Sequence, residues 1–197
     1  MFNGIIESTG IIQKIDAHGE SNRLTIEFDD KKFDDIKLGD SIAVNGICLT
    51  LEDITGNQLI FYTSSETNLK ISPFHVGQKV NLERSLILGS RISGHFVFGH
   101  IDGVAKLKGV TSIDKSEIWE LAVPTELSKY FAPKGSVAIN GVSLTINSVS
   151  KSSITINLIP FTIEHTSFQY NQIDDFLNIE VDMLARYVDS TLQNNNE

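Results

Sequence analysis

The fold is decided by one stretch of ten residues, Ser41-Ile42-Ala43-Val44-Asn45-Gly46-Ile47-Cys48-Leu49-Thr50. The same pattern returns 95 residues later as Ser136-Val137-Ala138-Ile139-Asn140-Gly141-Val142-Ser143-Leu144-Thr145. An Asn-Gly pair between two apolar runs is the strongest short-range hairpin signal, because both central residues of a type I′ turn need a positive φ. The sequence therefore predicts a β-hairpin at the centre of each of two related units.

The repeat extends outward from the two hairpins. Upstream, residues 2–6 match residues 97–101, and downstream Glu66-Thr67 matches Phe161-Thr162. By Asn81-Leu82-Glu83 and Asn178-Ile179-Glu180 the offset has grown to 97, so a two-residue insertion lies between. Solenoid repeats run to roughly 50 residues, so this longer repeat indicates a folded unit copied once. We predict two domains and a polar tail, over residues 1–95, 96–192 and 193–197.

Short segments with alternating apolar residues predict half-buried strands, as in Leu24, Ile26 and Phe28. Several short strands in each copy favour closure into a small barrel, which removes exposed sheet edges. Residues 124–131 could form two helical turns. The apolar residues Leu184, Tyr187, Val188 and Leu192 predict an amphipathic helix from about Asp182 to Leu192. Its apolar stripe could be buried on its own barrel or on a neighbouring subunit.

Composition excludes several classes of protein. The 16 Lys and Arg residues are outnumbered by 25 Asp and Glu residues and form no basic run, so a nucleic-acid partner is not expected. No window approaches the roughly 18 apolar residues of a membrane span. Cys48 is the single cysteine, which fits a reducing cytoplasm. No phosphate loop, dinucleotide fingerprint or nucleophile elbow is present.

Positions where the two copies differ in chemistry are candidates for function. His100 stands opposite Ile5, Lys134 opposite Gly39, Ser143 opposite Cys48, and Asp182 opposite Ser85. Each exchange places a group that can move a proton, hold a charge or attack carbon in the second copy. Taken singly, each also has a structural explanation: a solvated lysine, a serine that satisfies a turn, or a small buried cysteine.

His95 and His100 are the obvious candidates for metal ligands. A spacing of five residues directs them to opposite faces of a strand and about 140° apart on a helix. Neither geometry converges on one ion without a sharp turn, so we expect no metal site; two histidines in glycine-rich turns is the simpler interpretation.

Five motifs together resemble the riboflavin synthase family, whose members are duplicated lumazine-binding enzymes. They are the opening residues 1–5, the twin Asn-Gly segments, residues 94–100, residues 134–136 and residues 178–182. The resemblance implies two six-stranded Greek-key barrels, a C-terminal helix and a homotrimer with active sites between subunits. It also implies that two molecules of 6,7-dimethyl-8-ribityllumazine become riboflavin and 5-amino-6-(D-ribitylamino)uracil by transfer of a four-carbon unit. No cofactor is implied, and lumazine synthase is a candidate partner.

The resemblance also implies the site residues. His100 and Ser143 are the first choices for proton transfer and for the group that adds to the partner lumazine, with Lys134, Cys48 and Asp182 as further catalytic candidates. Phe2 could stack on a ring. The substrate contacts implied for the first barrel are Phe2, Gly4, Ile5, Ile6, Ser41, Cys48, Leu49, Thr50, Tyr62, Thr63, Ser64, Ser65, Glu66 and Thr67. Those implied for the second are His95, Gly99, His100, Ile101, Lys134, Ser143, Leu144, Thr145, Leu158, Ile159, Pro160, Phe161, Thr162 and Ile163.

Two alternatives remain. A non-catalytic lumazine or flavin carrier, like the fluorescent antenna proteins that resemble this family, would lack the paired histidine segment, whereas His95 and His100 are both present here. A purely structural pair of barrels would leave the coordinated exchanges unexplained. The chain departs from the family pattern at Asn3, where threonine is usual, at Ser93, and at Phe161, where glutamate is frequent.

Overall fold

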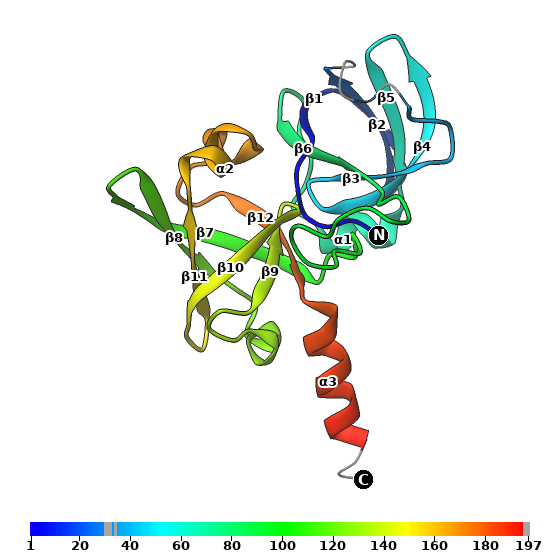
Figure 1. Cartoon of the computed structure of the whole chain (residues 1–197). Helices are drawn as coiled ribbons and strands as arrows, with labels where there is room; N and C mark the ends of the chain where they lie inside the picture. The colour runs from blue at the N-terminus through cyan, green and yellow to red at the C-terminus, as the bar shows by residue number, and fades with distance from the viewer. Residues whose placement is uncertain (30–32, 34, 195–197) are drawn as a thin grey trace.

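The computed structural model describes residues 1–29, 33 and 35–194 as two closed six-stranded antiparallel barrels followed by a helix (Figure 1). The first barrel has the strand order β1-β2-β5-β4-β3-β6, and the second repeats this order with β7 to β12. The predicted fold is thus confirmed. The strands of the first barrel are β1 (Ser8–His18), β2 (Ser21–Phe28), β3 (Ser41–Val44), β4 (Ile47–Thr55), β5 (Gln58–Thr63) and β6 (Lys79–Arg84). Those of the second are β7 (Gly103–Ile113), β8 (Ser116–Ala122), β9 (Ser136–Ile139), β10 (Val142–Val149), β11 (Ser153–Leu158) and β12 (Phe176–Val181).

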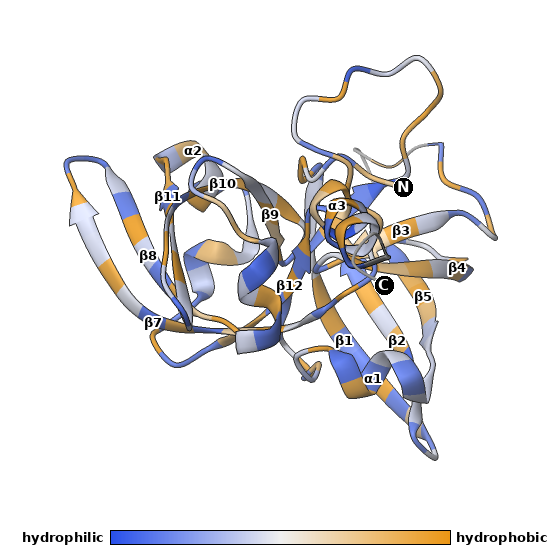
Figure 2. Ribbon diagram, turned by 90° about the horizontal axis from the view of Figure 1, so that it is seen from below, coloured by the Kyte–Doolittle hydropathy of each residue, from blue (hydrophilic) through white to orange (hydrophobic). Residues whose placement is uncertain are grey.

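Both predicted Asn-Gly hairpins are present. Asn45 and Gly46 have φ values of 45° and 81° between β3 and β4, and Asn140 and Gly141 have 44° and 80° between β9 and β10. These are the positive values that a type I′ turn requires. Apolar and polar residues alternate along the strands, as the banding of β7 and β8 in Figure 2 shows, and the apolar set fills each barrel.

Short helices close the ends of the barrels. They are α1 (Ser65–Lys70), η2 (Thr125–Tyr130), α2 (Pro160–Glu164) and η3 (Ser167–Tyr170). The two turns predicted at residues 124–131 are the 3₁₀ helix η2. The predicted C-terminal helix is α3 (Met183–Asn194), and it projects away from both barrels (Figure 1). The predicted polar tail begins within α3, and its residues 195–197 lie outside the described part of the chain. None of the described helices is long and apolar enough to cross a membrane.

Four buried asparagines join the barrels where the hairpin tips meet. The side-chain amide of Asn81 donates to the carbonyl of Asn140 at 2.9 Å, and that of Asn178 donates to the carbonyl of Asn45 at 3.0 Å. The side-chain oxygens of Asn45 and Asn140 accept the backbone N–H groups of Asn81 and Asn178, both at 2.8 Å. Each asparagine is at most 4% exposed, so the network is sheltered from water and fixes how the barrels meet.

Candidate functional site

Two loops cross from one copy of the repeat to the hairpin of the other. We call residues 2–6 the N-terminal loop and residues 97–101 the linker loop. They pair with each other through Phe2 and Val97, whose backbone N–H groups donate at 2.6 and 3.0 Å. The carbonyl of Gly4 then accepts the N–H of Ser143 at 2.8 Å, and that of Gly99 accepts the N–H of Cys48 at 3.0 Å. Each barrel therefore holds a loop that belongs in sequence to the other copy.

This crossing corrects the grouping expected from the sequence. Gly4 to Ile6 were placed with the first barrel and Gly99 to Ile101 with the second, because each segment belongs to that copy. In the structure Ile6 packs on the core of the second barrel and Ile101 on the core of the first. His100 consequently lies with Cys48, whereas Ser143 lies with His95.

The first half-site is a cavity of about 270 Å³ between the first barrel and the linker loop. The helix α1 positions its polar side chains, because Ser64 caps the helix by accepting the N–H of Thr67 at 3.2 Å. Thr67 and Glu66 line the cavity beside Cys48 and His100. The full lining is Ile47, Cys48, Glu66, Thr67, Lys70, Ile71, Gly99, His100 and Ile101.

The second half-site is built around Ser143, with His95 and Asn3 beside it. The Nδ1 atom of His95 lies 2.6 Å from the hydroxyl oxygen of Ser143. Burial lowers the pKa of His95, and the negative charge of Asp182 opposes this effect. A neutral imidazole can accept the serine proton, which is the arrangement of a general base and a nucleophile. The Nε2 atom of His95 and the Oδ1 atom of Asn3 are buried and have no hydrogen-bond partner among the residues that the structure describes.

Phe2 is placed differently from the sequence expectation. Its ring is 0% exposed and packs with Ala43, Val97 and Ala138 at the barrel junction. The predicted stacking of this ring on a ligand does not fit this structure, because the ring has no exposed surface. Phe2 instead anchors the N-terminal loop.

The remaining predicted contacts divide by the face on which they lie. Cys48 and Thr50 share one face of β4, and Ser143 and Thr145 share the equivalent face of β10, since side chains two apart point the same way. The side chains of Leu49, Thr63, Leu144 and Leu158 are buried in the barrels. Those of Ile5, Thr50, Tyr62, Thr145, Ile159 and Phe161 are exposed. Ser65, Pro160, Thr162 and Ile163 lie in α1 and α2, with Ile163 packed on the core of the second barrel.

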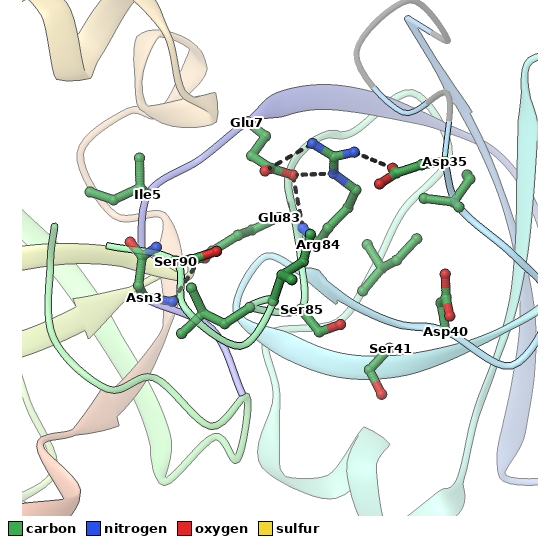
Figure 3. Close-up of a pocket in the computed structure, with 14 residues that line it drawn as sticks. Asn3, Ile5, Glu7, Asp35, Asp40, Ser41, Glu83, Arg84, Ser85 and Ser90 are labelled. Carbon is green, nitrogen blue, oxygen red and sulfur yellow. Dashed lines mark hydrogen bonds and ion pairs between the residues drawn. The ribbon is translucent and has the colours of Figure 1, made fainter. Parts of the chain in front are cut away.

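Three predicted polar residues lie outside both half-sites. Lys134 is exposed, and its backbone N–H donates to Ile146 at 2.8 Å on the turn before β9. Asp182 caps α3 by accepting the N–H of Leu184 at 3.0 Å, and only its charge reaches His95. Ser41 lines a separate cavity of about 350 Å³ next to Ile5 (Figure 3). Within the described ranges, no three His, Cys, Asp or Glu side chains gather to hold a metal ion.

Two functional candidates were missed from the sequence. Glu83 in β6 and Glu180 in β12 are 2% and 3% exposed, and each accepts backbone N–H groups of one crossing loop. Figure 3 shows the carboxylate of Glu83 directed at Asn3. Burial raises the pKa of each to about 7, and the amide hydrogen bonds oppose this effect. The available signal was a glutamate at the end of the matching segments Asn81-Leu82-Glu83 and Asn178-Ile179-Glu180 of the two copies.

Comparison with known proteins agrees with this geometry. The model of the lumazine binding domain family matches twice, over residues 3–85 and 98–182. Riboflavin synthase of Bacillus subtilis is 41% identical over 199 residues, which cover 100% of this chain and 92% of that protein. Riboflavin synthase of Photobacterium phosphoreum is 40% identical, covering 98% of this chain and 89% of that protein.

Solved structures of LumP share the fold. LumP complexed with riboflavin superposes with a TM-score of 0.85 at 28% identity, covering 92% of this chain and 99% of that chain. LumP complexed with 6,7-dimethyl-8-(1'-D-ribityl) lumazine gives a TM-score of 0.82 at 27% identity, with the same coverage. A chain that the family model matches in both barrels, and that full-length riboflavin synthases match from end to end, belongs to the lumazine-binding domain family.

Proposed function

We propose that this chain is a riboflavin synthase. It converts two molecules of 6,7-dimethyl-8-ribityllumazine into riboflavin and 5-amino-6-(D-ribitylamino)uracil. The atoms of the two lumazines account for both products, so the transfer needs no external donor, oxidant or reductant. The proposal is supported by full-length relatives at 40% and 41% identity that carry this name.

One observation carries the proposal: the two half-sites share a backbone frame and differ in their reactive groups. In both half-sites, a glycine carbonyl of a crossing loop accepts the backbone N–H of the second residue after the Asn-Gly turn. That residue is Cys48 in the first half-site, next to His100, and Ser143 in the second, next to His95. Two identical substrates with different fates need such a pair of sites, similar in recognition and different in chemistry.

The residues divide the work as follows. In the second half-site, His95 accepts the proton of Ser143, whose oxygen then adds to, or stabilises addition at, C7 of one lumazine. In the first half-site, His100 takes the proton from the C7-methyl group of the other lumazine, because an imidazole nitrogen can act as a general base. Thr67 and Thr162 offer hydroxyls to the ribityl chains. Holding two reactants in register supplies up to about 7–11 kcal/mol of the barrier reduction.

Assembly into a homotrimer is part of the proposal. A cavity of about 270 Å³ lies below the roughly 300–1,000 Å³ of most small-molecule sites, which supports a second subunit that completes the enclosure of the ligand. The side chains of Leu184, Tyr187 and Val188 in α3 are between 59% and 66% exposed, and a subunit contact would bury this apolar surface. A cytoplasmic location and an association with lumazine synthase stay predictions.

Conversion of lumazine is the direct test. We expect the purified chain, incubated with 6,7-dimethyl-8-ribityllumazine alone, to produce riboflavin absorbance and one aminouracil for each riboflavin. Tight binding of lumazine without turnover would favour the second candidate, a carrier, which the LumP superposition with a TM-score of 0.85 supports. Absence of both binding and turnover would contradict both functions.

A charge placed in the apolar surface of α3 tests whether this helix assembles the homotrimer. We expect Val188→Asp to yield monomers, because a charge at a subunit contact loses its hydration. Ser190→Asp is the matched control, since residue 190 lies about 200° further around the same helix and is exposed. Sedimentation velocity measures the oligomeric state, and far-ultraviolet circular dichroism checks that the barrels stay folded. A Val188→Asp protein that sediments with the wild-type mass would overturn the role of α3.

A further inference from the structure

The two crossing loops are each held by one buried carboxylate. Glu83 accepts the N–H of Asn3 at 2.8 Å with one oxygen and that of Gly4 at 3.1 Å with the other. Glu180 accepts the N–H groups of Phe98, Gly99 and His100 at 2.6, 2.8 and 3.1 Å. The two glutamates occupy the same position in the last strand of each barrel. The same arrangement has thus been kept in both copies.

A carboxylate suits this position because the loop presents backbone N–H donors to it. Buried backbone N–H groups need acceptors, and an ionised carboxylate offers two oxygens with about four lone-pair sites and no hydrogen of its own. A glutamine would offer one oxygen and would direct its own N–H groups at the loop. The arrangement is kept although burial disfavours the charge and raises the pKa of both glutamates. Strongly perturbed groups of this kind gather at functional sites.

Further charges surround each carboxylate. Glu7 lies next to Glu83 and raises its pKa, and Glu7 is itself paired with Arg84 at 2.8 Å (Figure 3). Asp102 lies next to Glu180 and is paired with Arg186 of α3. The side-chain oxygens of Glu7 and Asp102 also accept the N–H groups of Arg84 and Val181, at 3.1 and 2.8 Å. In each copy the loop is therefore fastened to the last strand at both of its ends.

When the backbone N–H groups of a loop bind a carboxylate on one side, the loop's carbonyl groups point to the opposite side. Gly4 and Gly99 have φ values of +74° and +79°, and their carbonyls accept the N–H groups of Ser143 and Cys48. A Cβ on either glycine would lie 2.5 Å from the Cβ of the residue opposite. With contact this close, any displacement of the loop displaces the residue that it touches.

We propose that Glu83 and Glu180 are positioning residues that act across the barrel junction, Glu83 holding Ser143 through the N-terminal loop and Glu180 holding Cys48 and His100 through the linker loop. The catalytic meaning of this positioning rests on the proposed function. The crossed control itself, in which each barrel's last strand sets the other barrel's half-site, rests only on the contacts above.

Amide hydrogen exchange tests the roles of Glu83 and Glu180 separately and does not depend on enzymatic activity. In the full-length protein, we expect Glu83→Gln to speed exchange about 10-fold or more at the amide of Ser143, because charge-assisted hydrogen bonds to its loop are lost. The amide of Cys48 should be unchanged. Glu180→Gln should give the reverse pattern. Glu120→Gln, at an exposed position of β8, is the matched control and should alter neither amide.

Conservative variants guard against misfolding. Glu83→Asp and Glu180→Asp keep both acceptor oxygens on a shorter side chain, so they should show the same sidedness with a smaller change. Circular dichroism confirms that each variant is folded. Equal effects of both substitutions on both amides, or no effect on either, would overturn the proposal and leave the glutamates with a purely structural role.

Kinetics connect the positioning to the reaction. If Glu83 acts through Ser143, then Glu83→Gln should lower kcat in the wild type but add little when Ser143 is already alanine. Glu180→Gln should lower kcat by the same factor in both backgrounds, because independent sites are additive. Additive effects for both pairs would contradict the assignment. A wild-type protein that makes no riboflavin would contradict the proposed function. The hydrogen-exchange data would still show whether Glu83 and Glu180 position the residues of the opposite barrel.

Discussion

Ser143→Ala is expected to lower kcat by about 10²–10⁴-fold while changing lumazine binding little. One well-placed proton-transfer group contributes that much, and a group that acts in the transition state shows its loss in kcat and kcat/KM together. The hydroxyl oxygen of Ser143 is 2.6 Å from the Nδ1 atom of His95, so the alanine variant removes the hydrogen-bond partner of this imidazole. Steady-state kinetics give the rate, and lumazine fluorescence titration gives the affinity.

Cys48→Ser is the matched comparison, because it gives the first hairpin the residue that the second hairpin carries. The hydroxyl can occupy the same position and leave substantial activity, whereas His100→Gln, beside it, should lower kcat strongly. Loss of activity in Cys48→Ser together with near-wild-type rates in Ser143→Ala and His100→Gln would reverse the roles of the two half-sites.

Gly141→Ala is expected to lower stability by about 2–5 kcal/mol, the sum of about 1–2 for a left-handed backbone and about 1–3 for overpacking. Gly141 has φ +80°, and a Cβ there would lie 2.8 Å from the nitrogen of Gly46 and 2.9 Å from its Cα. Both contacts are with backbone, so the barrels must separate and strain the asparagine network. For a chain of this size the melting temperature should fall by about 4–20 °C.

Gly77→Ala isolates the backbone part of that cost. Gly77 has φ +86°, but a Cβ there would lie more than 4 Å from every other atom of the described part of the chain that could hinder it. The melting temperature of Gly77→Ala should fall less than that of Gly141→Ala, because only the left-handed backbone conformation is penalised. Calorimetry on both variants decides, and equal shifts would mean that the close contact of the hairpin tips contributes nothing to stability.

Local patterns in the sequence carried most of the fold. The positive φ at Asn45-Gly46 and Asn140-Gly141 follows from the chemistry of two adjacent residues. Strands such as β2 and β11 follow from the alternation of apolar and polar residues over six to eight positions. The helix α3 follows from four apolar residues on one face. Each of these features is determined by neighbours in sequence, which is why they could be predicted.

The half-sites depend on contacts that no local pattern records. Nothing near Gly4 indicates that its carbonyl meets Ser143, and nothing near His100 indicates that it lies with Cys48. His95 and His100 are five residues apart, yet the linker loop sends them to different half-sites. Phe2, which looked available for stacking, is buried because the loop pairs with Val97.

The crossing loops also bear on the order of events during folding. Each barrel closes on strands from its own copy, so its contacts are comparatively close in sequence. The bonds that complete the second half-site and the junction span more of the chain: Ser143 binds Gly4 from 139 residues away and Asn178 binds Asn45 from 133 residues away, whereas the strand pairs that close each barrel, such as Ser8 with Leu82, span fewer than 80 residues. Long-range contacts are slow to form because loop closure costs entropy before the contact rewards it. The two barrels can therefore fold before the second half-site is complete, so we expect catalytic competence to follow barrel formation when the chain refolds.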